Sequence, residues 1–556
     1  MNYISFKDTK FEFRSSVGEK NDKGFFESEI IGEVPIPKII KTDRIILPID
    51  EGIAIDADGD YEDGEFSFDS ISHHFCGREG TMSMAVIERD KRYLLISLEN
   101  GVNSSYSLKK ENGVYSLSVY NQKPCRVFYK AFDNLITLCK EYKSLKRKKF
   151  LTLSEKAEQN AEVEKLFGGA IFWIWNDNYD EIMYSDYDTD KNPQTSEKLI
   201  EISRELKQNG IDRAMFGIFF KKDGEYAEKL YKDFGYICTQ YDNYSDCLNP
   251  ERLSIIPNNR VKNCDYTERR MKDYPDGISM DENGNLRGAW ALKGFDGKMY
   301  SQNRVCPYIG MKRMKEEVPE VLKKYPYYKG RFVDVYGGSI EECFNPKHPV
   351  TLEECVKVKK QAFENLKQMG LIAGTEDGFE DIIDSLVYTE GLHSPVYFRN
   401  KDSGRRHANM YNEKERKHIE KQMLSPKLRI PLWQMVYHEN LLSFPYWGDS
   451  TDDSVEQIKD KILFSCLFGC PPLYSFSVSD FEKLKQTIVS SYKKISKVNK
   501  KTAAESITDY RVLNDDFTLQ QTVFGNKYSV TANFSDIEQY YNGEKIPPKD
   551  FVFKTL

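Results

Sequence analysis

The sequence has no long apolar run and no strongly basic stretch. No segment approaches the ~20 consecutive apolar residues that a membrane-spanning helix needs, so we expect no membrane association. The opening residues, MNYISFKDTKFEF, lack a basic start followed by an apolar stretch. This indicates a cytoplasmic protein, with an exported protein whose leader has been cleaved as the alternative. The net charge is −7 and the one basic run is the short KSLKRKK at 143–149, so nucleic acid is not an expected partner.

Cysteine pairs and metal motifs are also scarce. The chain has 11 scattered cysteines, an odd number that favours free thiols in a reducing compartment over a disulfide framework. The closest pair, Cys466 and Cys470, lies in an apolar stretch without a nearby histidine, so we expect core thiols there rather than a zinc site. His348, in NPKHPV, is interpreted as a surface turn residue. The acidic segment DADGDYEDGE (56–65) lacks the flanking helices of a calcium loop and is interpreted as a solvated loop.

What is present indicates a multidomain protein. Residues 1–135 alternate short apolar and polar positions between Gly, Asp and Asn, which predicts an N-terminal antiparallel β-sandwich. Residues 136–166 are charged, have apolar residues at helical spacing and predict a helical linker. Residues 476–556 combine one amphipathic helix with a second alternating region, so we expect a helix followed by a small C-terminal β domain.

Residues 167–475 have a different pattern, in which amphipathic stretches end at glycine and buried apolar segments follow. About eight such segments predict an α/β fold, a (β/α)8 TIM-like barrel. A doubly wound sheet is the alternative, and the lack of a GxGxxG turn after the first segment counts against it. The predicted apolar segments include GGAIFWIW, RFVDVYGG, LIAGTEDG, DSLVYTEG, IPLWQMVYHE and ILFSCLFGCPP.

Two carboxylates fall where barrel enzymes carry their chemistry. Asp334 immediately precedes the turn that closes RFVDVYGG, and Glu376 occupies the same place in the next segment, LIAGTEDG. The carboxyl ends of barrel strands meet at one mouth, so we expect the two side chains to face one cleft. Two such carboxyl groups are the smallest set of catalytic groups that glycoside hydrolysis needs. Strand-end acids also cap helices or pair with arginine, and the pattern alone leaves both interpretations open.

Further residues could line the same mouth and bind substrate. All five tryptophans lie in the predicted barrel; Trp175 ends its strand and is the better candidate for a sugar platform, whereas Trp173 has only apolar neighbours and is interpreted as core. Glu390, at the end of DSLVYTEG, has two equally supported interpretations: it binds the substrate, or it forms hydrogen bonds within a loop. The other candidate substrate-binding residues are Asp242, Trp290, Tyr336, His438, Glu439 and Asp449.

The sequence also resembles known enzymes. The pair VDVYGG and GTEDG resembles the catalytic core of the α-N-acetylgalactosaminidases of glycoside hydrolase families 101 and 129. LTLSEKAEQNAEVEKLFGGAIFWIW resembles the segment that leads into their barrel, RIPLWQMVYHENLLSF a late barrel strand, and TVFGNKYSVTANFSD their C-terminal β domain. The resemblance therefore covers nearly the whole chain.

This resemblance implies a retaining hydrolase with Asp334 as nucleophile and Glu376 as acid and base. The implied substrate is N-acetylgalactosamine α-linked to Ser or Thr, in mucin-type oligosaccharides or glycopeptides. No cofactor is implied for the chemistry; a structural calcium is implied, but no ligand set for it is identified. An α-glycosidase for another sugar, such as an α-galactoside, and a non-catalytic carbohydrate-binding protein are the alternatives.

Overall fold

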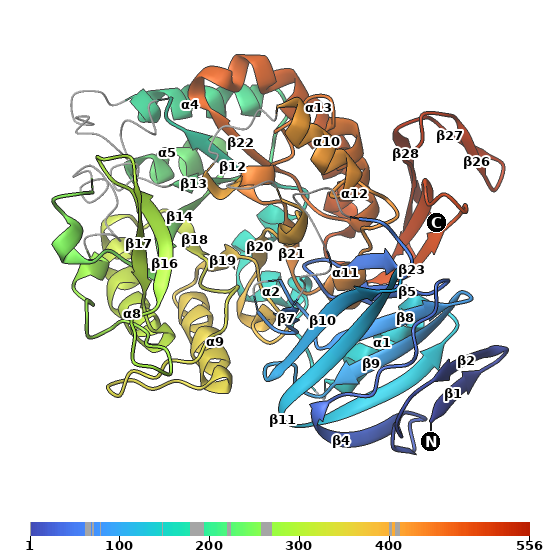
Figure 1. The fold of residues 1–556 in the computed structure, drawn as a ribbon. Coiled ribbons are helices and arrows are strands. Elements are labelled where there is room, and N and C mark those ends of the chain that lie inside the picture. The colour runs from blue at the N-terminus through green and yellow to red at the C-terminus, as the bar shows by residue number, and fades with distance from the viewer. Residues whose placement is uncertain are drawn as a thin grey trace.

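The centre of the molecule is a sheet of eight parallel strands (Figure 1). The computed structural model describes residues 2–61, 68, 72–77, 79–146, 148–177, 194–218, 224–256, 269–399, 403–405 and 412–556. In chain order the eight strands are β12 (Ala170–Trp175), β13 (Ala214–Ile218), β14 (Ile237–Asn243), β18 (Tyr328–Asp334), β19 (Ile372–Glu376), β20 (Tyr388–Glu390), β21 (Leu442–Phe444) and β22 (Leu473–Ser477). Their spatial order is β21-β20-β19-β18-β14-β13-β12-β22. The two ends of this row are the seventh and eighth strands, as in a nearly closed (β/α)8 barrel.

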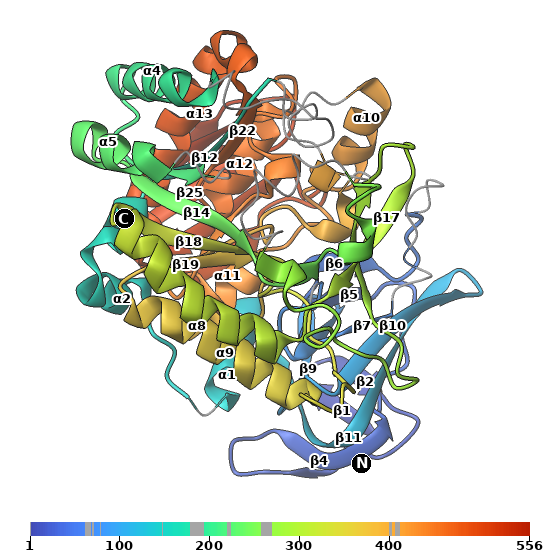
Figure 2. The ribbon, with the colours of Figure 1, turned by 90° about the vertical axis from the view of Figure 1, so that its left-hand side faces the viewer.

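Helices connect most of these strands. They are α4 (Gln194–Gln208), α5 (Gly224–Phe234), α8 (Pro307–Lys324), α9 (Leu352–Gln368), α10 (Glu413–Lys421), α11 (Leu432–Tyr437) and α12 (Ile458–Phe468), and α13 (Phe481–Thr502) follows the last strand. Helices α8 and α9 pack side by side next to β18 and β19 (Figure 2). Helix α9 shows why the chain alternates here: Thr351 and Glu354 form a capping box at its start, and Gly370, with φ of 78°, follows its end.

Antiparallel β structure flanks the barrel on both sides in sequence. The N-terminal part contains β1 (Tyr3–Phe6), β2 (Thr9–Glu12), β3 (Glu19–Lys20), β4 (Phe26–Glu33), β5 (Arg44–Leu47), β6 (Ile53–Asp56), β7 (Ser72–His74), β8 (Met84–Arg89), β9 (Arg92–Leu98), β10 (Ser104–Glu111) and β11 (Val114–Phe132). Strands β3 to β11 form one nine-stranded sheet. Helices α1 (Leu135–Leu145) and α2 (Leu153–Gln159) and the 3-10 helix η2 (Ala161–Leu166) then lead to β12.

The C-terminal part is smaller. It contains β23 (Ile507–Val512), β24 (Leu519–Phe524), β25 (Tyr528–Asn533), β26 (Gln539–Tyr541), β27 (Glu544–Ile546) and β28 (Asp550–Thr555). Strands β24 and β25 form a hairpin around FGNK, with Gly525 and Asn526 at positive φ in its turn. The predicted fold class, a barrel flanked by β domains, is therefore confirmed.

A small insertion lies between β14 and α8. It contains β15 (Asp246–Cys247), β16 (Gly288–Lys293) and β17 (Met299–Arg304), which form a three-stranded antiparallel sheet. This sheet follows the carboxyl end of β14, so its chain leaves the barrel on the side where the carboxyl ends of the strands lie.

Two apolar segments differ from their predicted structure. IPLWQMVYHE and ILFSCLFGCPP were placed among the barrel strands by the pattern, but they form helices α11 and α12, and the strands β21 and β22 follow them. Every residue of α11 is buried, and α12 is buried from Lys461 to Phe468. A helix that is surrounded by protein has no polar face. Its sequence is then a continuous apolar run, which has the same pattern as a buried strand.

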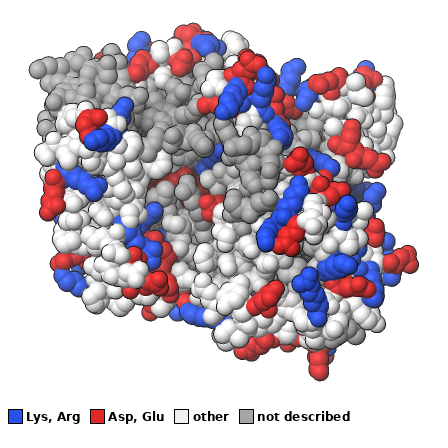
Figure 3. All heavy atoms as spheres, viewed as in Figure 1, with Lys and Arg blue, Asp and Glu red and all other residues white. Residues whose placement is uncertain are grey.

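One apolar core joins the three parts of the chain. It includes Ile45 from the N-terminal sheet, Phe363 from α9, Leu467 from α12 and Phe524 from β24. Within the described residues, no helix is both long and apolar enough to cross a membrane. Figure 3 shows basic and acidic side chains interspersed on one face, without a field of one sign.

Candidate active site

Asp334 and Glu376 are the last residues of the neighbouring strands β18 and β19. The strands pair in parallel with Val333 opposite Thr375, so the two acids occupy the next position along each strand. Both are buried, with 8% and 4% of their surface exposed. The side chain of Glu376 is close enough to Asp334 to lower the pKa of that carboxyl group. The structure thus brings together the two carboxyl groups that the sequence singled out.

The backbone turns sharply after each acid. Val335 and Asp377 both have positive φ, 50° and 55°, a conformation that is rare for residues with a Cβ and strained for the β-branched valine. The turn after β18 packs tightly on β19: Gly337 N–H donates to Thr375 Oγ1 at 2.9 Å, and the same hydroxyl donates to Val333 O at 2.7 Å. A Cβ on Gly337 would lie 2.3 Å from the Thr375 side chain. The exit of β18 is therefore fixed against β19.

Asp334 is held by two polar side chains of β14. Tyr241 donates its hydroxyl to Oδ2 at 2.6 Å, and Asn243 Nδ2 lies 3.4 Å from the same atom. Burial raises the pKa of Asp334 to about 6, although the hydrogen bond from Tyr241 and the neighbouring Glu376 side chain act in the opposite direction.

The raised pKa of Asp334 predicts a stability cost. The native state binds this proton more tightly than the unfolded chain, so the free energy of unfolding falls as pH rises from about 4 to about 6 and stays lower above that. Asp334→Asn removes the titration and should raise the free energy of unfolding by about 1–3 kcal/mol at pH 7.5, with little gain at pH 4. Urea unfolding at both pH values measures this. The control is Asp212→Asn, an exposed acid before β13; an equal gain in both variants would contradict the explanation.

A third carboxyl group, Glu390, completes the cluster. It ends β20, pairs in register with Glu376 and is fully buried. Trp173 Nε1 donates to its Oε2 at 3.0 Å. Burial raises the pKa of Glu390 well above its usual range, and the nearby Asp334 and Glu376 act in the same direction, so the fold favours the neutral form of this group. Its strand-end position was visible in the sequence, but its protonation state depends on neighbours that only the fold assembles.

A buried arginine balances the acids at the mouth. Arg399 lies near Glu376 (Nη1 to Oε1, 3.8 Å), Asp377 (Nη2 to Oδ1, 3.5 Å) and Asp449 (Nε to Oδ2, 3.4 Å). Its guanidinium group also stacks 4.1 Å from the centre of the Tyr446 ring. Asp449, a predicted substrate-binding residue, therefore lies near the two acids, and it interacts with the same arginine as Glu376 and Asp377. No local pattern marks Arg399, because its segment has neither strand nor helix periodicity.

Aromatic rings form one side of the site. Trp173 and Trp175 stack with ring centres 5.9 Å apart, and Trp447 contacts both edge-on. Trp175 Nε1 donates to Ser475 Oγ at 3.0 Å, which fixes its ring at the end of β12. Trp290 is on β16 of the insertion and is 42% exposed. Its ring and Tyr446 both lie against Gly404, so Trp290 is at the rim of the same mouth.

Four predicted residues lie elsewhere. Asp242 points away from Asp334 on the opposite face of β14 and forms an ion pair with Arg331. Tyr336 is buried, donates to Pro307 O at 2.7 Å and packs on α9. His438 and Glu439 follow helix α11 rather than a strand; His438 contacts backbone oxygens of Glu505 and Gly469, and Glu439 pairs with Lys143. These four side chains join structural elements to one another, which corrects their predicted place at the mouth.

The implied calcium has no matching ligand set among the described residues. Each group of three close potential ligands there contains a cysteine, whereas calcium takes oxygen ligands. Part of the acidic segment 56–65 lies outside the described residues. The calcium stays a prediction, and no step of the chemistry is assigned to it.

Comparison with solved structures finds the same architecture. The α-N-acetylgalactosaminidase NagBb from Bifidobacterium bifidum in complex with GalNAc matches with a TM-score of 0.67 at 16% identity, over 94% of this chain and 83% of that one. The GH36 α-galactosidase AgaB from Geobacillus stearothermophilus matches at 0.51 and 11% identity, over 88% and 66%. The GH31 dextranase FjDex31A from Flavobacterium johnsoniae matches at 0.51 and 10% identity, over 98% and 67%. At these identities the likeness shows the fold.

Comparison of the sequence with known families gives the assignment. No curated protein sequence matches the chain. A family model described as "Glycosyl hydrolases related to GH101 family, GH129" matches residues 205–523, which is more than half of the chain and includes Asp334, Glu376 and Glu390. The chain therefore belongs to glycoside hydrolase family 129.

Proposed function

We propose that this glycoside hydrolase acts with retention of configuration on α-linked N-acetylgalactosaminides, such as mucin-type oligosaccharides and glycopeptides. The observation that carries the proposal is the position of Asp334 and Glu376 side by side at the ends of two paired strands. Neighbouring strands are about 4.8 Å apart. Retaining enzymes have their carboxyl groups about 5–5.5 Å apart, whereas inverting enzymes need about 6.5–9.5 Å to admit a water.

The proposed reaction has two steps. Ionised Asp334 attacks the anomeric carbon while Glu376 gives its proton to the departing glycosidic oxygen, which forms a β-linked glycosyl ester. Glu376, now a carboxylate, then takes a proton from water as the water attacks the same carbon. The ester bond breaks, Asp334 leaves as a carboxylate, and the product has the α configuration of the substrate. Tyr241 and Asn243 orient Asp334 for the attack.

The sugar is the less constrained part of the proposal. Trp290, at the rim of the mouth, has an exposed ring of the kind on which sugars stack. The likeness to a GalNAc-bound enzyme supports N-acetylgalactosamine, and the likeness to AgaB supports α-galactosides as the second candidate. A panel of nitrophenyl α- and β-glycosides, with the released anomer followed by NMR, tests all of this. An α product released first from the α-GalNAc substrate is expected; a β product would refute retention, and binding without turnover of any substrate would favour a carbohydrate-binding protein.

The pH dependence provides a further prediction. The attack requires ionised Asp334, whose pKa is about 6, so kcat/KM should fall about tenfold per pH unit below that value. Tyr241→Phe removes a hydrogen bond that lowers this pKa and should move the acidic limb to higher pH. The control is Tyr236→Phe, whose hydroxyl bonds to Ile211 O before β13. An acidic limb that stays in place in Tyr241→Phe would contradict the assignment of this limb to Asp334.

A further inference from the structure

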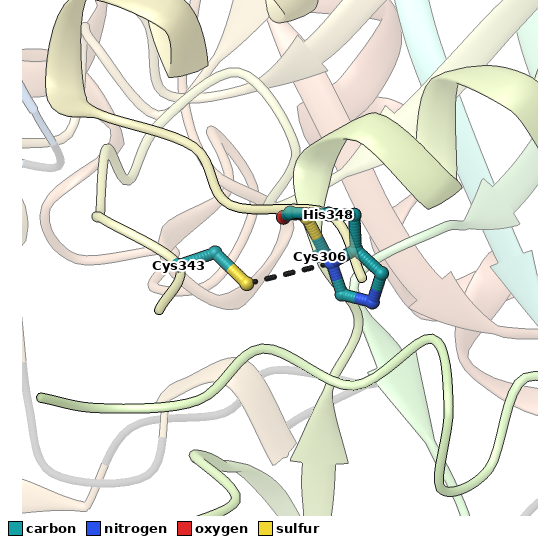
Figure 4. Close-up of side chains that lie close together, drawn as sticks. All are labelled: Cys306, Cys343 and His348. Carbon is teal, nitrogen blue, oxygen red and sulfur yellow. Dashed lines mark hydrogen bonds between the residues drawn. The ribbon is translucent and has the colours of Figure 1, made fainter. Parts of the chain in front are cut away.

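A second cluster of reactive side chains lies outside the active site. Cys306, Cys343 and His348 are buried together, with one ligand atom from each within 4.8 Å of the others (Figure 4). Cys306 immediately precedes α8, whereas Cys343 and His348 lie in the loop between β18 and α9. The interpretation of His348 as a surface turn residue is therefore wrong, since it is 9% exposed.

The backbone holds these residues in place. Cys343 and Val350 exchange two hydrogen bonds, at 2.8 and 2.9 Å, which closes the loop into a hairpin and sets His348 beside Cys343. Cys306 N–H donates to Gly277 O at 3.0 Å, which ties the start of α8 to the insertion. The cluster is thus built from two segments, each of which is held in place by its own backbone hydrogen bonds.

The imidazole of His348 presents a free electron pair to the thiols. Its Nε2 lies 2.7 Å from Asp276 O, and a carbonyl oxygen can only accept, so Nε2 carries the proton. Nδ1 is then unprotonated and faces Cys343 Sγ at 3.5 Å. A backbone carbonyl that fixes the tautomer in this way is the usual support of a metal-binding histidine.

The spacing suits a tetrahedral metal site. Zinc bonds of about 2.3 Å to sulfur and about 2.0–2.1 Å to nitrogen place the two ligand atoms about 3.5 Å apart at tetrahedral angles. This is the separation between Cys343 and His348. The two other clusters of this kind in the described residues include Glu51 and Glu380, which already pair with Arg429 and Lys146. Their carboxylates are therefore neutralised by protein cations.

We propose that Cys306, Cys343 and His348 bind a structural zinc ion. Both thiols lose their protons to solvent when the metal binds. The fourth ligand of the zinc is either a water molecule or the thiol of Cys355, which packs in the same apolar cluster. The zinc joins the start of α8, and through Gly277 and Asp276 the insertion that carries Trp290, to the loop that follows Asp334. The zinc stabilises one side of the barrel mouth and takes no part in the reaction.

Metal analysis of the full-length protein tests the proposal. After exposure to zinc and dialysis, the wild type should retain one zinc per chain. Cys306→Ser, Cys343→Ser and His348→Gln should each lose it, whereas Cys466→Ser, a change at a free buried cysteine in α12, should keep it. Zinc should raise the Tm of the wild type and of Cys466→Ser, and should leave the Tm of His348→Gln unchanged.

Cobalt substitution of the wild type gives a test that needs no variant. Bound Co²⁺ should show a sulfur-to-cobalt charge-transfer band and intense visible bands typical of tetrahedral coordination. A wild type that retains no zinc and gives only the pale spectrum of hydrated cobalt would overturn the proposal. Zinc retained by all three ligand variants would overturn it as well, as would a disulfide between Cys306 and Cys343 in freshly purified protein.

Discussion

Replacing Asp334 with Asn should reduce kcat/KM on every glycoside substrate by about 10³-fold or more. The amide keeps the shape of the carboxyl group and can still accept the hydrogen bond from Tyr241, but it cannot form the glycosyl ester. Because the variant should also be more stable than the wild type at neutral pH, the loss cannot be attributed to unfolding. Kinetics with the nitrophenyl substrate that the wild type prefers, alongside Asp212→Asn, measures the effect.

A rescue experiment separates a nucleophile from a positioning residue. In Asp334→Ala, added azide should attack the anomeric carbon of an activated aryl α-glycoside from the vacated side and give the β-glycosyl azide. The same azide should have no effect on Asp212→Ala. Residual activity of Asp334→Asn within tenfold of the wild type, or an α-azide product, would show that Asp334 is not the nucleophile.

Glu376→Gln should have an effect that depends on the leaving group. A natural glycosidic oxygen needs a proton as it departs, so hydrolysis of a glycopeptide should slow by about 10²–10⁴-fold. A dinitrophenyl leaving group needs little protonation, so the first step should be nearly unaffected and the glycosyl-enzyme should accumulate, because Glu376 is also the base of the second step. Burst kinetics with the activated substrate and steady-state kinetics with the glycopeptide measure the two effects.

Glu390→Gln is the matched control for that experiment. The buried surroundings favour the neutral form of Glu390, which accepts a hydrogen bond from Trp173, and a glutamine can accept the same bond. Any loss of activity should therefore be equal for good and poor leaving groups. If Glu390→Gln showed the leaving-group dependence and Glu376→Gln did not, the role of acid and base would pass to Glu390.

The sequence predicted the features that depend on local pattern. Strand ends are marked by the turn residues that follow them, so Asp334 and Glu376 could be placed at the barrel mouth from RFVDVYGG and LIAGTEDG alone. The parallel register then brought them together without further information. The alternation of helix and strand around α9 was equally clear, since its capping box and terminal glycine are local signals.

Features that depend on the surroundings could not be predicted. A fully buried helix such as α11 or α12 has no polar face, so period alone did not separate it from a strand. Asp242 is next to Asn243, which faces Asp334, but the pleat turns Asp242 to the other face, where Arg331 meets it. Arg399 and two of the partners of His348, Asp276 and Cys306, are distant in sequence from the residues that they meet, so no short stretch of sequence encodes these contacts.

The continuous core restricts how this enzyme can change over evolutionary time. Ile45, Phe363, Leu467 and Phe524 belong to one apolar cluster, so removing either flanking β domain would leave the barrel helices with a bare hydrophobic surface. The three parts of the chain are therefore not independent modules, because exchanging a flanking domain would have to preserve this buried apolar surface. New specificity has to come from the loops and the insertion around the mouth, where residues such as Trp290 can change while the core stays closed.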